Sequence, residues 1–139
     1  MRRTKDHLTS IGLLLLRVGG GALLLFGHGL PKLLHWSERV SSFANPIGLG
    51  SQVSFSLVVF AEVVCAAAVV LGVATRLAAA PIIFFLLVAA FVQNGPGSFS
   101  DKELALVYLV PFVTLTLTGG GHYALDTLIL RGRAGRRRL

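Results

Sequence analysis

The chain has 139 residues, of which 54% are hydrophobic and only 14% are charged. This length suits a single domain, and the charged share lies well below the roughly 25% of a soluble domain. Cys65 is the single cysteine, which excludes an internal disulfide, a CxxC redox pair and a thiol oxidase that works as an isolated chain. We therefore expect an integral membrane protein.

The net charge of +7 is concentrated at the two ends of the chain. Basic residues that flank apolar runs act as topology signals or contact anionic lipid head groups, so membrane lipids are the expected partners and nucleic acid is not. The flanking basic residues are Arg2, Arg3 and Lys5 before the first apolar run, and Arg131, Arg133, Arg136, Arg137 and Arg138 after the last.

Four apolar runs predict four transmembrane helices. The first run begins like a signal peptide, but it is too long, Arg17 interrupts it, and no small-x-small cleavage site follows. The second run is long enough to cross about 30 Å of hydrocarbon. The predicted spans cover about 11–34, 53–74, 77–93 and 103–118, and a basic tail follows at 131–139.

The connections between these runs predict how neighbouring helices meet. A polar stretch over 35–52 forms the longest loop, whereas Thr75-Arg76 forms a tight turn that makes the second and third helices antiparallel neighbours. Ser100 is the expected cap of the fourth helix, with Glu103 as its capping-box partner. Pro111 is expected to kink that helix.

The distribution of basic residues predicts the orientation. With both ends in the cytoplasm, the cytoplasmic segments carry nine basic residues, and the outer segments carry three, Lys32, Arg39 and Lys102. An odd number of spans would place the basic ends on opposite sides. The predicted fold class is an all-α membrane protein, an antiparallel four-helix transmembrane bundle with both termini cytoplasmic.

Polar residues inside the spans are the candidates for a site. Arg17, His28 and Lys32 lie on one stripe of the first helix, at steps of three and four that also include Gly21, Leu24 and His35. Glu62 lies near the middle of the second span. An unpaired charge at that depth costs about 2.5–3.5 kcal/mol, so we expect Glu62 to pair with Arg17, with His28, or with both.

Two interpretations of these residues stay open. Buried ion pairs often only fix helix packing, and in that case Arg17 and Glu62 form a structural clamp. Intramembrane ionisable residues are also typical of functional sites, which predicts a polar ligand pocket that opens outward. The candidate pocket residues are Arg17, His28, Lys32, Glu62, Asn94 and Glu103.

Other chemistry has weaker support in the sequence. His28 and His35 have no carboxylate or cysteine at metal-ligand spacing, so no metal is expected. Haem between helices needs facing histidines, and no second histidine lies inside a span. No nucleophile–base–acid arrangement is present, so no residue is assigned a catalytic role, and Cys65 is expected to be a small packing residue.

Several short segments occur along the chain in a characteristic order. They are Leu16-Arg17, Gly27-His28-Gly29-Leu30-Pro31-Lys32-Leu33, Phe60-Ala61-Glu62, Leu71-Gly72-Val73-Ala74-Thr75-Arg76-Leu77-Ala78, Lys102-Glu103-Leu104-Ala105 and Gly119-Gly120-Gly121-His122-Tyr123-Ala124-Leu125-Asp126. Taken in order, these segments resemble the DoxX family of small four-helix bacterial membrane proteins, and the resemblance covers nearly the whole chain. Similar sequences often carry a histidine where this chain has Asn94, and an amide cannot carry a proton at neutral pH.

The resemblance implies a multi-pass protein of the bacterial inner membrane that takes part in redox work. The namesake of the family is a subunit linked to thiosulfate oxidation with quinone as acceptor, and other members are accessory subunits. By this resemblance the chain is a quinone-linked subunit without a covalently bound cofactor, with redox subunits as partners. If it takes part in catalysis, it does so as an accessory subunit of an oxidoreductase.

In this hypothesis His28 hydrogen-bonds a quinone carbonyl, Glu62 exchanges a proton and Arg17 holds Glu62 ionised. A non-catalytic scaffold or assembly subunit, and a carrier of a small solute or lipid, are the alternatives. A homo-oligomer would enlarge the cavity of so small a chain, and the sequence leaves the oligomeric state open.

Overall fold

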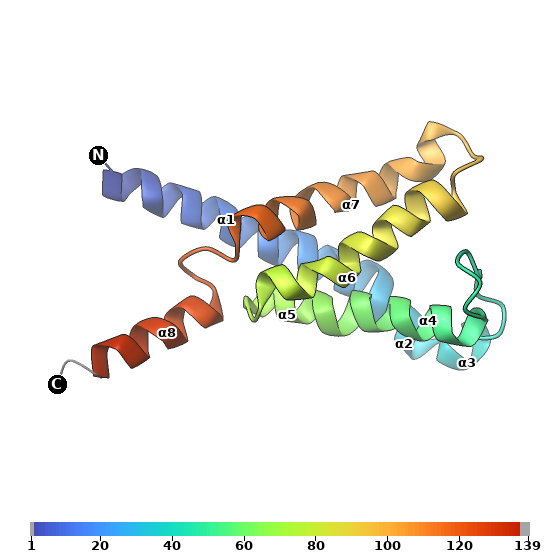
Figure 1. Ribbon diagram of the computed structural model, residues 1–139, viewed down its shortest axis with the longest axis horizontal. Coiled ribbons are helices and arrows are strands. Elements are labelled where there is room, and N and C mark those ends of the chain that lie inside the picture. The colour runs from blue at the N-terminus through green and yellow to red at the C-terminus, as the bar shows by residue number, and fades with distance from the viewer. Residues whose placement is uncertain (1, 137–139) are drawn as a thin grey trace.

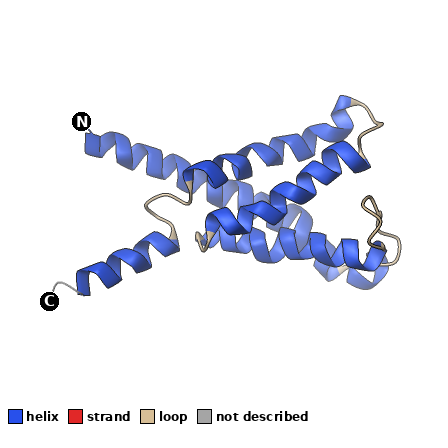
Figure 2. Cartoon of the chain, in the orientation of Figure 1, coloured by secondary structure: helices blue, strands red, loops and turns tan. Residues whose placement is uncertain are grey.

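The structure, a computed structural model, describes residues 2–136, and within these the side chains of residues 6–130. Residues 137–139 of the basic tail lie outside the described residues, as do the side chains of 131–136. The described part is helical and contains no strand (Figure 2). In chain order the helices are α1 (Arg2–Leu24), η1 (Leu25–Gly29), α2 (Leu30–Leu34), α3 (Trp36–Arg39), α4 (Ser51–Val59), η2 (Phe60–Cys65), α5 (Ala66–Leu71), α6 (Thr75–Leu87), η3 (Val88–Gln93), α7 (Phe99–Thr118) and α8 (Leu125–Arg136); η marks π-helical turns.

Within residues 2–136, three continuous helical stretches are long and apolar enough to cross a membrane. They are Asp6–Leu34, Ser51–Leu71 and Thr75–Gln93, which agree with the first three predicted spans. α7 has 20 residues, but Asp101, Lys102 and Glu103 lie near its start. The crossing of the membrane by α7 therefore stays a prediction.

The helices associate in two pairs that diverge toward one end of the molecule. α1 and the segments that continue it pack against α5 and η2, while α6 packs along α7. The pairs are close where Gly20 of α1 faces Pro111 of α7, since a Cβ on Gly20 would lie 3.3 Å from the Pro111 ring. From there they separate toward the end that carries the loop after α3 (Figure 1).

Glycines on α1 and η1 allow the first two helical stretches to approach closely. A Cβ on Gly21 would lie 2.6 Å from a methyl group of Val70, and one on Gly29 would lie 2.5 Å from the backbone oxygen of Glu62. Small residues are typical of helix contacts in membranes, where close packing replaces the hydrophobic effect as the force of association. These contacts fix the depth at which residues of the two helices meet.

Two local predictions from the sequence were wrong. The turn between the second and third long stretches is formed by Gly72, Val73 and Ala74, and Thr75 already begins α6. Gly72 has φ +77° and ends α5, because glycine adopts this left-handed conformation at little cost. The N-cap of α7 is Ser98, whose N–H donates to the Asp101 carboxylate at 2.7 Å. Ser100 and Glu103 are not the capping pair because the helix begins earlier than predicted.

Candidate functional site

A cavity of about 300 Å³ lies between the two diverging helix pairs. All three π-helical segments contribute to its wall: η1 through His28, η2 through Ala61 and Glu62, and η3 through Val88, Ala89 and Gln93. A π-helical turn inserts an extra residue and redirects the side chains that follow, and such turns occur frequently at functional sites. Their convergence marks this cavity as the candidate site.

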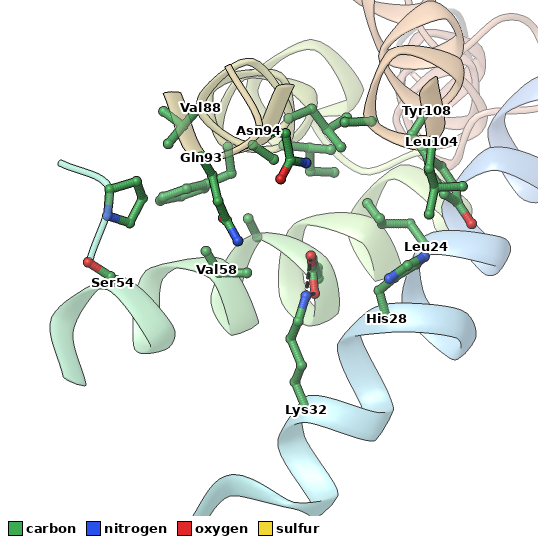
Figure 3. Close-up of a pocket in the computed structure, with 18 of the residues that line it drawn as sticks. Leu24, His28, Lys32, Ser54, Val58, Val88, Gln93, Asn94, Leu104 and Tyr108 are labelled. Carbon is green, nitrogen blue, oxygen red and sulfur yellow. Dashed lines mark hydrogen bonds and ion pairs between the residues drawn. The ribbon is translucent and has the colours of Figure 1, made fainter. Parts of the chain in front are cut away.

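Lys32 and Glu62 form an ion pair on the cavity wall (Figure 3). The Lys32 Nζ atom lies 2.7 Å from one carboxylate oxygen of Glu62 and 2.5 Å from the other. Their side chains are only 17% and 15% exposed, so much of the pair is shielded from surrounding solvent. Gly29 packs on the backbone of Glu62 and Lys32 follows one turn later, which explains why the two side chains meet.

His28 and Tyr108 form the neighbouring part of the wall. Their rings meet edge to face, with centroids 5.4 Å apart, and His28 comes from η1 whereas Tyr108 comes from α7 (Figure 3). The Tyr108 hydroxyl reaches across to η1, where a Cβ on Gly27 would lie 3.9 Å from it. An imidazole and a phenol thus stand beside the ion pair, and both can donate or accept a hydrogen bond.

The rest of the wall is mainly apolar. Asn94 and Gln93 also line the cavity, but the Asn94 amide donates to the backbone oxygen of Asp101 at 2.9 Å. The cavity therefore combines one polar wall with an otherwise apolar lining, a pattern typical of small-molecule sites. The apolar lining includes Leu24, Val58, Ala61, Ile82, Phe85, Leu86, Leu104 and Ala105.

Arg17 does not pair with Glu62, so the first of the two predicted pairings was wrong. Its guanidinium donates to the backbone oxygen of Tyr123 at 3.2 Å, and no contact of Arg17 with the cavity is present among the described residues. The glycine contacts place Arg17 beside Gly72, ten residues from Glu62, or about 15 Å along a helix. The arginine cannot bridge that difference in depth.

The alternative pairing of Glu62 with His28 does not form a hydrogen bond among the described contacts, although both residues line the cavity. Lys32 takes the role that the sequence suggested for Arg17. Of the six predicted pocket residues, the structure brings together His28, Lys32, Glu62 and Asn94. Glu103 is exposed on α7 and does not line the cavity.

Arg17 belongs to a second polar cluster, at the opposite end of the helices. The guanidinium is 1% exposed, and its Nε and Nη1 atoms have no hydrogen-bond partner. It lies against Gly72 at the C-terminus of α5, where a positive charge is stabilised by the helix dipole. Nearby, Asp126 accepts a hydrogen bond from Ala74 N–H at 2.5 Å and donates its own N–H to the Gly72 oxygen at 3.2 Å. The cluster ties the segment after α7 to the turn before α6.

Sequence reasoning missed other polar residues that line the cavity: Ser54, Gln93, Asp101 and Tyr108. Tyr108 is a lone polar aromatic residue in an apolar run, and this feature is a usable signal. Within residues 2–136, no three His, Cys, Asp or Glu side chains gather closely enough to hold a metal ion. The His28 imidazole and the Tyr108 phenol are placed to form hydrogen bonds with a ligand in the cavity.

Long apolar helices around a cavity with one polar wall are typical of a membrane protein. A family model described as DoxX matches residues 12–95, more than half of the chain, and the chain belongs to the DoxX family. Neither a comparison with curated proteins nor a comparison with solved structures gives a significant match. The family assignment that the sequence motifs predicted is thus confirmed.

Proposed function

We propose that this DoxX-family protein is a quinone-binding subunit of a redox system in the bacterial inner membrane. It crosses the membrane four times, with both termini and the turn at Gly72–Ala74 in the cytoplasm. The cavity then lies in the outer half of the membrane. Electrons come from partner subunits, and this chain supplies the place where the quinone head group is held.

The topology is supported by charge and by helix packing. α7 lies along α6 for most of its length, so a membrane that contains α6 surrounds α7 as well. Nine basic residues then lie in cytoplasmic segments and three outside, in line with the positive-inside rule. The charged residues at the start of α7 lie at the outer interface, where Lys102 donates to the backbone oxygen of Gly95.

The observation that carries the ligand proposal is the composition of the cavity wall. A quinone head group is a flat apolar ring with carbonyl acceptors, and it needs apolar walls together with hydrogen-bond donors. Leu24, Ile82 and Phe85 supply apolar surface, while His28 and Tyr108 present donors beside the Lys32–Glu62 pair. A cavity of about 300 Å³ is large enough for the head group alone.

Each polar residue has a defined role in this proposal. A bound quinone accepts electrons and protons; His28 and Tyr108 orient its carbonyl oxygens by donating hydrogen bonds. Glu62 is the group that exchanges a proton, and Lys32 positions its carboxylate by donating to both of its oxygens. Arg17 has no part in this chemistry.

A scaffold function is the second candidate, and the cluster around Arg17 favours it. The contacts among Arg17, Asp126 and the turn at Gly72–Ala74 connect three parts of the chain, and these residues do not line the candidate cavity. Such a cluster stabilises a rigid cytoplasmic face on which partner subunits can assemble. The two functions are compatible, since a quinone-binding subunit also has to hold its partners.

The experiment that tests the proposal measures quinone that co-purifies in mild detergent, per folded protein. Ala105 lines the cavity, so Ala105→Phe fills it and should abolish retention. Ala80 is exposed on α6 and does not line the cavity, so Ala80→Phe is the matched control and should retain quinone like the unchanged protein. Equal quinone content in the two variants would contradict the proposal.

A further inference from the structure

The charges of Lys32 and Glu62, which both line the cavity, balance one another. Lys32 contacts both oxygens of Glu62, so neither charge is left to attract an ion. Asp101 at the rim accepts hydrogen bonds from the backbone N–H and the hydroxyl of Ser98, at 2.7 and 2.9 Å. The groups left to face a ligand are the His28 imidazole, the Tyr108 hydroxyl and the Gln93 amide. Such a wall favours an uncharged molecule over an anion or a cation from water.

One side of the cavity is bordered by a seam between the first helical stretch and α7. α7 packs against α1, α6 and η3, but among the described elements it does not pack closely against α2. Leu104 lines the cavity while 55% of its surface is exposed, so the wall at this point is only one side chain thick. Tyr108 of α7 spans this seam, because its ring meets the His28 ring of η1 (Figure 3). Its hydroxyl lies near Gly27 of the same segment.

The opposite side is covered by other parts of the chain. Phe43, Pro46 and Ile47 of the loop before α4 line the cavity there. Phe43 and Trp36 both pack against Phe55, with ring centroids 5.1 and 5.0 Å apart. Because Phe55 is fully buried, this aromatic cluster fixes the loop in place. The seam with a single movable tyrosine is the weaker barrier.

We infer that the cavity is loaded from the membrane, by an uncharged amphipathic molecule that passes between η1 and α7 where Tyr108 closes the seam. This inference rests on the proposed function and adds to it the route and the charge class of the ligand. Tyr108 swings aside as the ring passes, and its hydroxyl then donates to the bound polar group. A Cβ on Gly27 would already lie 3.9 Å from the Tyr108 hydroxyl, so a long side chain at this position would meet the tyrosine.

The test uses the fluorescence of Trp36, the single tryptophan of the chain. Trp36 packs against Phe55, which in turn packs against the cavity residue Phe43. The full chain is reconstituted in phosphatidylcholine vesicles and mixed with vesicles that carry a benzoquinone with a decyl tail. Bound quinone quenches Trp36, so the rate and the saturation of quenching report loading. The same ring with a sulfonate group is the charged comparison and should give no saturable quenching.

Gly27→Leu fills the seam and should slow loading by about tenfold or more. The added side chain has to be displaced before the ligand can pass, which raises the barrier to entry. Gly27→Ala is the matched control, because its Cβ fits at 3.9 Å from the Tyr108 hydroxyl and should leave the rate unchanged. Tyr108→Ala should speed loading, although it weakens equilibrium binding.

Saturable quenching at equal rates in Gly27→Leu and Gly27→Ala, or saturable quenching by the sulfonated ring, would overturn the inference alone. Unchanged loading in Tyr108→Ala would also overturn the route, even if Gly27→Leu failed to fold. The absence of saturable quenching by the neutral quinone in the unchanged protein would instead overturn the proposed function on which the inference rests.

Discussion

Lys32 of α2 holds both carboxylate oxygens of Glu62 of η2, at 2.7 and 2.5 Å, and this pair forms the charged part of the cavity wall. The contact depends on Gly29, which brings the two helices together one turn before Lys32. A membrane protein that places such a pair beside an imidazole and a phenol has the groups needed to bind a polar ring and exchange a proton.

Removing one member of the pair should cost more than removing both. Lys32→Met leaves the Glu62 carboxylate in place without its cation and should lower stability by about 1.5–3 kcal/mol, the value of a hydrogen bond to a charged group. Lys32→Met combined with Glu62→Gln should recover part of this loss. Thermal unfolding of all variants in one detergent measures the coupling, and a double variant as unstable as the sum of the singles would show that the residues are not partners.

Arg17 should affect stability without affecting the ligand. Arg17→Met removes the donor to the Tyr123 oxygen and the charge at the end of α5, so we expect a loss of about 1–3 kcal/mol. Quinone content per folded molecule should stay unchanged. Arg17→Met and Glu62→Gln should also be additive within about 0.5 kcal/mol, because the two sites are far apart. A coupling energy between Arg17 and Glu62 as large as that between Lys32 and Glu62 would show that Arg17 does pair with Glu62.

The glycine contacts predict opposite effects for two similar substitutions. Gly29→Ala places a Cβ against the backbone of Glu62 and should separate the helices, at a cost of about 1–3 kcal/mol. Gly19→Ala meets no atom within 4 Å and should stabilise α1 by about 0.5–1 kcal/mol, since alanine is the better helix former. Melting temperatures of the two variants give the comparison, and equal shifts would argue against the close approach at Gly29.

The four-span topology predicts the side of the membrane on which each segment lies. Reporter domains fused at Leu139 and inserted at Gly48 should give opposite signals, cytoplasmic at Leu139 and external at Gly48. Gly48 lies in the loop before α4, where a Cβ would meet nothing within 4 Å, so an insertion there should be tolerated. Matching signals at the two positions would rule out an even number of spans.

The sequence was sufficient to predict the helical architecture. It also predicted which face of the first helix carries the site residues of that helix. Apolar length predicted the three stretches that qualify as spans, and the stripe on the first helix placed Leu24, His28 and Lys32 on one side. These features follow from local periodicity and composition, which can be read directly from the sequence.

The pairing of charges was not predictable because it depends on relative depth. Helical periodicity places Arg17 and Lys32 on the same face of the first helix, but only the packing of Gly21 and Gly29 decides which of them meets Glu62. The three π-helical turns add further shifts that no propensity scale reports. Tyr108 was missed for the same reason, since its partner His28 is distant in sequence and belongs to another helix.

The affinity of Glu62→Gln for a decyl-tailed benzoquinone tests most directly whether the cavity wall built on Glu62 binds a quinone. Saturable quenching of Trp36 gives the Kd in the unchanged protein, in Glu62→Gln and in Arg17→Met, each checked for folding by thermal unfolding. We predict a Kd about tenfold higher in Glu62→Gln, equivalent to about 1.4 kcal/mol. The reason is that Lys32 loses its charged partner, which leaves an uncompensated positive charge in the cavity wall. Arg17→Met should bind like the unchanged protein. An unchanged Kd in a stably folded Glu62→Gln would show that the wall built on Glu62 does not bind the quinone.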